Sequence, residues 1–231
     1  MKLSLRVLGW FAVAAAGAFL FIQLYYLGRI WWMKDHNPAT TAFMQAGLER
    51  LREKKPDAAL RHAWVPYDRI SAHLKRAVVA AEDARFVDHE GFDWDAIEKA
   101  LERNRRKGRV VVGGSTISQQ LAKNLFLSGE RTPWRKGQEA LITVMIEYVM
   151  DKRRILELYL NVIEWGDGVY GAEAAARHYF GASAAQLAPT QAARLAAIVP
   201  NPRYYDRVRS TPWLERKTQM IVGRMPAAEL P

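Results

Sequence analysis

Apolar residues fill one continuous stretch near the start of the chain and then recur at helical spacing almost to its end. Residues 7–27 are apolar except for Gln23. A helix over this stretch is about 30 Å long, which matches the hydrocarbon thickness of a bilayer. Beyond it the apolar spacing indicates one helix after another, with almost no strand-like alternation. We therefore predict a mostly α protein with one N-terminal transmembrane helix, the anchor occupying residues 1–30.

An alternative for the same stretch is a cleavable signal peptide, with the Ala-Gly-Ala at residues 16–18 as its cleavage site. Nine further positions, residues 19–27, continue the apolar and aromatic run beyond that site, which is too many for a signal peptide. Trp10 and Tyr25 lie near the ends of the stretch, where interfacial aromatic residues are expected. We favour an uncleaved anchor. Basic residues flank both ends, so the flanking charges do not fix its orientation.

Residues 31–66 have scattered prolines and mixed charge, which predicts a linker with a short helix around residues 43–54. A longer helix should begin at the capping residue Ser71 and end at Glu82. Its buried stripe is expected to consist of Leu74, Ala77, Val78 and Ala81.

Asp93 should cap a helix that stops before Gly108, and residues 109–112 form the one convincing strand-like run. Pro133 should occupy the first position of a helix that ends near Met150. We expect the apolar side of that helix to carry Leu141, Val144, Met145 and Tyr148. Three more helices are expected over residues 152–160, 171–180 and 190–199.

The formal net charge is +10, which raises the question of nucleic-acid binding. The densest basic runs are residues 103–107 and 152–154, and no nucleic-acid-binding module surrounds them. A membrane anchor also argues against a DNA-reading role, whereas anionic lipid headgroups would account for the same charge. We therefore expect membrane lipids, and no nucleic acid, among the partners. With no cysteine, the chain has neither disulfides nor thiolate metal sites.

Residues 113–124 predict a glycine-rich turn that leads into a helix capped by Ser115 or Thr116. One apolar stripe of that helix consists of Ile117, Leu121 and Leu125. Thr116, Gln120 and Lys123 fall together on another face. Free backbone N–H groups at the helix start, with amides and an ammonium beside them, would suit a phosphate. The alternative is an ordinary amphipathic helix with a solvated polar face.

Glu82 ends an apolar helix, so its carboxylate should lie at the edge of a partly desolvated surface. Burial raises the pKa of a carboxylate and makes it a better base at neutral pH. The structural alternative is a salt bridge to Arg85 or Lys75. His89 has no second histidine or cysteine at metal-ligand spacing, so we expect it to bond Asp83 or the backbone nearby.

A third polar cluster consists of Arg131, Arg135, Lys136 and Glu139. Arg135 and Glu139 are four residues apart, the spacing of a surface ion pair worth a few tenths of a kcal/mol on a helix.

These motifs resemble those of the peptidoglycan glycosyltransferases of glycosyltransferase family 51, the bacterial transglycosylases that polymerise lipid II. Residues 113–120 read Gly-Gly-Ser-Thr-Ile-Ser-Gln-Gln and are similar to that family's Gly-Gly-Ser-Thr-Ile-(Thr/Ser)-Gln-Gln signature. Residues 82–91 resemble its first motif, Glu-Asp-x-x-Phe-x-x-His-x-Gly. Residues 152–161 resemble a further motif, and the similarity extends over residues 70–205.

The resemblance implies a lysozyme-like, mostly α glycosyltransferase domain over residues 67–231. It implies a monofunctional enzyme, because the chain ends soon after this region. The implied reaction joins lipid II units into linear β-1,4 glycan strands, with inversion at the anomeric carbon and release of undecaprenyl pyrophosphate.

The resemblance also assigns roles to single residues. Glu82 is the implied general base and Glu139 the second active-site carboxylate, while Lys123 and Arg131 are the implied contacts of the donor pyrophosphate. The remaining implied substrate-binding residues are Asp83, Phe86, His89, Ser115, Thr116, Gln119, Gln120, Asn124, Arg135 and Lys136. No cofactor is required, and a divalent cation (Mg²⁺ or Mn²⁺) held with the help of Glu139 is left open.

The implied location is the bacterial inner membrane, with a single pass and a periplasmic catalytic domain. Lipid II and the growing lipid-linked glycan are the expected substrates, and other cell-wall synthesis or division proteins are candidate partners. Two alternatives remain. A lytic transglycosylase or lysozyme would also use a catalytic glutamate but would not need the polar surface around Lys123. An anchored scaffold without activity would need neither Glu82 nor Lys123.

Overall fold

The computed structural model describes residues 2–109, 113–130 and 132–231, with side chains from residue 6 onward. Of the predicted strand-like run at residues 109–112, only Arg109 lies within this description, and Arg131 lies outside it.

The described chain is mostly α-helical, as predicted, and its only strands are three short segments. The first half contains α1 (Lys2–Met33), α2 (Ala42–Lys54), α3 (Ala72–Glu82), α4 (Trp94–Lys107), α5 (Ile117–Phe126) and α6 (Pro133–Val149). The second half contains α7 (Lys152–Val162), α8 (Ala172–Phe180), α9 (Pro189–Ile198), α10 (Pro202–Val208) and α11 (Pro212–Arg224).

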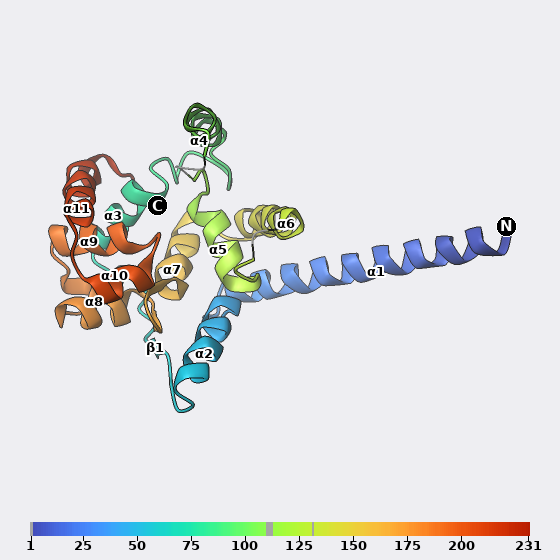
Figure 1. The fold of residues 1–231 in the computed structure, drawn as a ribbon, viewed down its shortest axis with the longest axis horizontal. Helices are drawn as coiled ribbons and strands as arrows, with labels where there is room; N and C mark the ends of the chain where they lie inside the picture. Colours follow the sequence, from blue (N-terminus) through green and yellow to red (C-terminus); the bar gives the residue numbers. More distant parts are fainter. Residues whose placement is uncertain (1, 110–112, 131) are drawn as a thin grey trace.

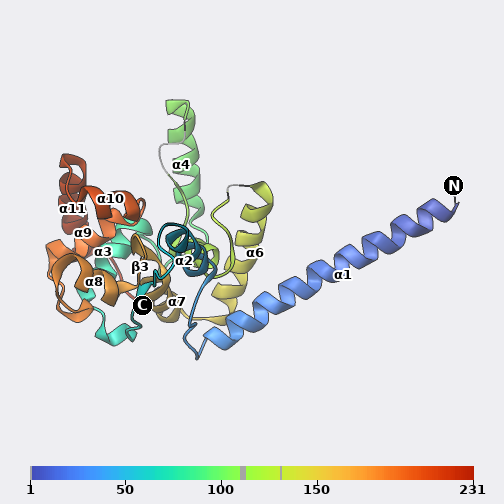
Figure 2. The ribbon, with the colours of Figure 1, turned by 60° about the horizontal axis from the view of Figure 1, so that its bottom comes forward.

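Helix α1 extends well beyond the body of the protein, and the N-terminus lies far from every other element (Figure 1). Its segment Arg6–Met33 has a mean hydropathy of 2.0 and is long enough to cross a membrane. Most of that segment is exposed, and only its C-terminal end contacts the body, chiefly at α6 (Figure 2). The prediction of one long, apolar N-terminal helix is thus confirmed.

Capping residues begin most of the helices, as the sequence indicates. The side chains at the N-cap positions accept hydrogen bonds from the first turn of the helix, which satisfies N–H groups without an intrahelical partner. These caps are Thr41, Ser71, Asp93, Thr116, Thr132, Asp151 and Thr211. At the other end of α4, Gly108 adopts a left-handed conformation at φ 63°.

The helices form two groups that meet along α7. Helix α3 packs against α9 and α11, while α5 packs against α2, α6 and α7. Figure 1 shows α5 between α6 and α7, with α3, α9 and α11 on the far side of α7. One continuous apolar core runs through both groups and includes Leu74, Leu121, Ile146, Leu158 and Leu195. The end of α3 and the start of α5 are therefore held against the same core.

A small three-stranded sheet, not predicted from the sequence, closes the side near α2. The strands are β1 (Arg61–His62), β2 (Glu164–Gly166) and β3 (Val169–Tyr170), in the order β1-β3-β2. Strand β3 pairs parallel with β1 and antiparallel with β2. Two- and three-residue strands carry too little alternation to be recognised in a sequence.

Of the four residues predicted for the buried side of α6, only Met145 packs against the core, and it is partly buried. Leu141, Val144 and Tyr148 are exposed, Tyr148 at 88%. The buried face instead carries Gln138, Glu139, Ile142, Thr143 and Ile146. Apolar residues lie on both faces of α6, so periodicity does not decide which face is buried. Helix α4 also differs from the other helices of the body. It projects outward, and Ala100 is the one buried residue along it (Figure 2).

Candidate active site

Glu82 is the last residue of α3, and its carboxylate faces α5. Its Oε2 accepts a hydrogen bond from Gln120 Nε2 at 2.9 Å. The two cations that offered a salt bridge in the sequence are engaged elsewhere: Arg85 pairs with acidic residues at the start of α4, and Lys75 donates to a backbone carbonyl. The alternative of a helix-end salt bridge is therefore wrong.

The surroundings of Glu82 favour its protonated form. Burial raises the pKa of Glu82 above its ordinary value, and the Asp83 charge adds to this. The hydrogen bond from Gln120 and the charges of Lys217 and Lys123 act in the opposite direction and are outweighed. A carboxylate whose pKa is raised toward neutrality is a stronger base than an exposed one. The prediction that burial raises the pKa of Glu82 is confirmed.

Asp83, the next residue, joins α3 to α5. Its Oδ2 accepts from the backbone N–H of Ile117 at 2.9 Å, and its Oδ1 accepts from His89 Nε2 at 2.9 Å. A carboxylate at a helix N-terminus is stabilised by the free N–H groups and the helix dipole. The predicted bond between His89 and Asp83 is confirmed. These two bonds tie Asp83 to the start of α5 and to His89. The position of the adjacent Glu82 relative to α5 is therefore fixed.

The prediction that the start of α5 offers free N–H groups to a phosphate is wrong for the N–H groups of Thr116, Ile117 and Gln119. The Thr116 N–H donates to Gln119 Oε1, and the Gln119 N–H donates to Thr116 Oγ1, which together form a capping box. The Ile117 N–H is bonded to Asp83. The anion at this helix terminus is therefore a side chain of the protein itself.

The turn at Gly91 brings α6 close to this network. Gly91 has φ +88°, and a Cβ there would lie 2.8 Å from Thr143 Cγ2 and 3.0 Å from Glu147 Cγ. Its carbonyl accepts from Thr116 Oγ1 at 2.6 Å. Glycine is required here both by the left-handed backbone and by the close approach of α6.

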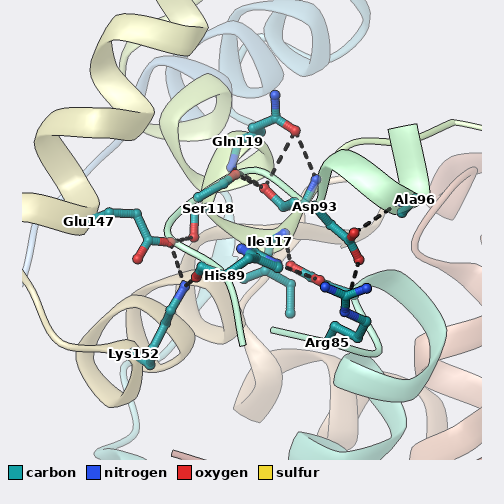
Figure 3. A network of polar contacts seen from close by, with 12 residues as sticks. Arg85, His89, Asp93, Ala96, Ile117, Ser118, Gln119, Glu147 and Lys152 are labelled. Atoms are coloured by element: carbon teal, nitrogen blue, oxygen red, sulfur yellow. Dashed lines mark hydrogen bonds and ion pairs between the residues drawn. The ribbon is translucent and has the colours of Figure 1, made fainter. Parts of the chain in front are cut away.

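A second polar group braces the network from α6 and α7 (Figure 3). Lys152 Nζ donates to Glu147 Oε1 at 2.8 Å and to the carbonyl of His89, and Ser118 Oγ also donates to Glu147. The Lys152 ammonium lies 4.8 Å from the centre of the Phe86 ring, a cation–π arrangement. Ser118, Glu147 and Lys152 thus hold the Phe86–His89 segment beneath Glu82.

Of the two glycines before α5, Gly114 is needed for close packing, whereas a Cβ on Gly113 would meet no atom within 4 Å. Neither Gly113 nor Gly114 has a positive φ. A Cβ on Gly114 would lie 3.1 Å from the Ile97 Cα of α4. The segment therefore passes against the α4 backbone, which the sequence-based expectation of a tight turn did not include.

Glu82 opens onto a cleft of about 400 Å³ whose other wall is cationic. Lys123 of α5 and Arg135 and Lys136 of α6 line it, together with Glu139. The rest of the lining consists of Phe43, Ser115, Gln119, Gln120, Gly129, Glu130 and Pro200. The cleft therefore brings together eight of the residues predicted from sequence: Glu82, Ser115, Gln119, Gln120, Lys123, Arg135, Lys136 and Glu139.

Lys123 is held in the cleft with part of its hydration removed. Its ammonium lies 5.3 Å from the centre of the Phe43 ring. Burial lowers the pKa of Lys123 below its ordinary value, and the Glu139 charge partly opposes this. A partly desolvated ammonium interacts strongly with an anion that enters the cleft.

Glu139 is 3% exposed, so its ion pairs are not the surface pair that its spacing suggests. Arg135 Nη1 donates to its Oε2 at 2.6 Å, and Lys136 Nζ donates to its Oε1. With both oxygens on cations, Glu139 orients the basic wall of the cleft. In the described ranges no group of three or more His, Cys, Asp or Glu side chains could hold a metal ion. Both oxygens of Glu139 are paired with Arg135 and Lys136 in this arrangement.

A second cavity, of about 260 Å³, lies on the other side of Glu82. Glu82 and Ser115 line both spaces. The walls of the second cavity come from the end of α3, the start of α4, the glycine segment and Arg224 of α11. A single carboxylate thus borders a cationic cleft and a second cavity. That arrangement can accommodate two substrates, one on each side of the base.

Of the remaining predicted site residues that the structure describes, three line neither space and two line only the second cavity. Phe86 and His89 are buried and line neither, and Asn124 is buried with its Nδ2 donating to the carbonyl of Gln120. Asp83 and Thr116 line only the second cavity. Phe86 contacts Lys152 and His89 bonds Asp83, which are contacts of positioning residues and not of substrate-binding ones.

Lys217 and Tyr159 are site residues that the sequence reasoning missed. The Lys217 charge acts on Glu82 from α11, and the Tyr159 hydroxyl donates to Gln120 Oε1 at 2.8 Å. Tyr159 lies within the motif at residues 152–161. Its hydroxyl on an otherwise apolar, buried helix face was the signal that could have identified it. Lys217 belongs to no motif, and nothing in the sequence separates it from other surface lysines.

Comparison with known proteins agrees with this site. Residues 49–226 match the transglycosylase family. The chain is 62% identical to the biosynthetic peptidoglycan transglycosylase of Chromobacterium violaceum, with 98% of this chain and 99% of the relative covered. It is 64% identical to the protein of that name from Nitrosospira multiformis (90% and 91% covered) and 60% identical to that from Dechloromonas aromatica (100% of both).

A partly buried glutamate beside a cationic cleft can act as a base toward a substrate that carries an anionic group. The chain belongs to the transglycosylase family of enzymes.

Proposed function

We propose that this protein polymerises lipid II into the linear β-1,4 glycan strands of peptidoglycan. The growing lipid-linked glycan is the donor, and lipid II is the acceptor. Family membership and the names of the relatives support the class of reaction. The observation that carries the proposal is the position of Glu82, a carboxylate of raised pKa between a cationic cleft and a second cavity.

The proposed step exchanges one bond at the anomeric carbon and transfers one proton. Glu82 takes the proton of the acceptor sugar's 4-hydroxyl as that oxygen attacks the anomeric carbon of the donor. The bond from the anomeric carbon to the pyrophosphate breaks, and its electron pair leaves with undecaprenyl pyrophosphate. An α-linked donor becomes a β-linked product, so the configuration inverts. General base catalysis of this kind contributes about 10²–10⁴-fold.

The cationic side of the cleft would stabilise the leaving pyrophosphate. Lys123, Arg135 and Lys136 are on this side, and Arg131 is proposed to join them on the ground of its motif position. Charge that develops on the leaving group is then met by groups already oriented by Glu139. Preorganised electrostatic stabilisation is usually the largest single contribution to catalysis. The donor therefore belongs in the cationic cleft and the acceptor in the second cavity.

The reaction as proposed uses no cofactor, and no step passes through a metal ion, because both oxygens of Glu139 are engaged by cations. We place the protein in the bacterial inner membrane, with α1 as a single-pass anchor and the catalytic domain in the periplasm. The length and hydropathy of α1 support the anchor. The proposed substrate supports the periplasmic location of the catalytic domain, because lipid II is polymerised outside the cytoplasm.

Incubation of the purified full-length protein with labelled lipid II tests the proposal. Appearance of glycan polymer, sensitive to a muramidase, is the expected result. A matched incubation with preformed glycan strands should leave them intact. Cleavage of those strands would indicate a lytic enzyme, and no change in either incubation would indicate a scaffold.

A further inference from the structure

The C-terminal part of α1 is docked on the catalytic domain by specific contacts. Gln23 Nε2 donates to Gln138 Oε1 of α6 at 3.1 Å, and each residue is 8% exposed. On either side of this bond, the Phe19 and Trp134 rings lie 6.1 Å apart and the Tyr26 and Phe126 rings 5.3 Å apart. These contacts place about two helical turns of α1 beside α6 and the end of α5.

Gln23 is the one strongly polar residue within the apolar run at residues 7–27. A polar side chain in a membrane span is costly unless it faces protein and finds a partner there. Gln23 meets this condition through its Nε2, whose partner Gln138 precedes Glu139 on the buried face of α6. The anchor is thus registered against the helix that carries the cationic wall of the cleft.

Between α1 and α6 lies a groove of about 280 Å³. Its apolar walls are formed by Phe19, Ile22 and Tyr26 from α1 and by Phe126, Leu127 and Trp134 from the body. Trp134 is 69% exposed, although it lines the groove. A surface of this kind, next to a membrane-spanning segment, is suited to a hydrocarbon chain.

The groove adjoins the catalytic cleft. Arg135 and Glu130 line both spaces. Arg135 also has a buried Nε that bonds no group in the described part of the chain. A ligand that fits both spaces has an anionic group at the cations of the cleft and an apolar chain in the groove. A lipid pyrophosphate has this chemistry.

We propose that this groove binds the isoprene units next to the pyrophosphate of the lipid-linked donor, so that α1 forms part of the substrate site. The inference rests on the function proposed above. It commits to the polyprenyl chain and not to a bilayer phospholipid, because the shared residue Arg135 belongs to the wall that faces the pyrophosphate. The anchor would then contribute to substrate recognition as well as to tethering.

The first test fills the groove from the α1 side. Ile22 lines the groove, whereas Leu24, two positions along the same helix, does not. Ile22→Trp should raise KM for lipid II about tenfold, or about 1.4 kcal/mol of binding, with little change in kcat. Leu24→Trp adds the same bulk to the same helix and should match the parent. Thermal midpoints of both variants equal to that of the parent would show that the fold is unchanged.

An analogue of lipid II with a shortened polyprenyl chain separates the two proposals. The parent should show a lower KM for the full-length chain than for the short one, and Ile22→Trp should abolish that difference. If the parent polymerises lipid II but Ile22→Trp and Leu24→Trp have the same KM for both substrates, the groove assignment is wrong and the proposed function stands. If the parent makes no polymer from either substrate, both proposals fail.

A direct measurement on the unaltered protein covers the case in which Ile22→Trp does not fold. A photoactivatable polyprenyl pyrophosphate should label peptides that contain Phe19, Ile22 or Trp134. Excess undecaprenyl pyrophosphate should remove the labelling, and excess phosphatidylglycerol in the same micelles should not. Labelling elsewhere, or equal displacement by phosphatidylglycerol, would mean that the groove does not recognise the donor.

Discussion

Gln120 donates a hydrogen bond from Nε2 to Oε2 of Glu82 at 2.9 Å. The orientation of its amide is set by Tyr159, whose hydroxyl donates to Gln120 Oε1 at 2.8 Å. A donor aimed at a carboxylate stabilises the ionised form and limits the rise in pKa that burial causes. Gln120 therefore adjusts the pKa of the proposed base while keeping it directed at the cleft.

Gln120→Leu should move the activity of the enzyme to higher pH. Without the donor, the pKa of Glu82 should rise further, so the ascending limb of the kcat/KM profile should shift upward. Tyr159→Phe should cause a smaller shift in the same direction, since the amide keeps its place but loses its orienting partner. An ascending limb that stays where it is in Gln120→Leu would show that this bond does not control the base.

Glu82→Gln should stabilise the fold at neutral pH. The folded-state pKa of Glu82 is raised by burial, so its contribution to stability is complete below the ordinary pKa of glutamate and is lost as pH rises through the raised value. The neutral amide avoids that loss. Thermal unfolding of the variant and the parent should give a higher midpoint for the variant at neutral pH and equal midpoints in acid. A lower midpoint at neutral pH would contradict the burial argument.

Asp83→Ala should destabilise the protein and displace Glu82. It leaves the Ile117 N–H and the His89 ring without their acceptor, and a buried unsatisfied donor costs about 1–3 kcal/mol. The nearby Asp88 is exposed, so Asp88→Ala should change the unfolding free energy by no more than about 0.5 kcal/mol. Denaturant unfolding of both variants measures the difference, and equal values would remove Asp83 from its structural role.

Lys123→Ala should slow polymerisation by about 10²–10³-fold, the loss expected when one preorganised electrostatic contact is removed. Arg131→Ala should behave alike if its motif position places it in the same cleft. The control is Lys99→Ala on the exposed side of α4, which should leave the rate unchanged. Turnover of Lys123→Ala close to that of Lys99→Ala would withdraw the pyrophosphate contact.

Local signals made much of the fold predictable. Caps such as Ser71, Asp93 and Thr132 bond residues two or three positions away, so their effect is visible in the sequence itself. The glycine motif placed Gln120 and Lys123 on one face, and the structure puts both in the cleft.

Tertiary contacts account for what the sequence could not predict. Helix α6 is apolar on two faces, and only the packing of α5 and α1 decides that Leu141 is exposed while Glu139 is buried. The bond from the Ile117 N–H to Asp83 joins two motifs that are far apart in the sequence. Either motif taken alone therefore predicts that the N–H groups at the start of α5 are free. Lys217 approaches Glu82 from the last α-helix, which only the folded chain reveals.

The most direct test of the account compares binding with turnover in Glu82→Gln. The amide keeps the shape of the side chain and can still accept from Gln120, but it cannot take a proton from the acceptor hydroxyl. The variant should therefore bind lipid II as tightly as the parent and lose about 10²–10⁴-fold in polymerisation rate. Polymerisation at the parent rate would remove Glu82 from the mechanism, and loss of binding would mean that its role is structural.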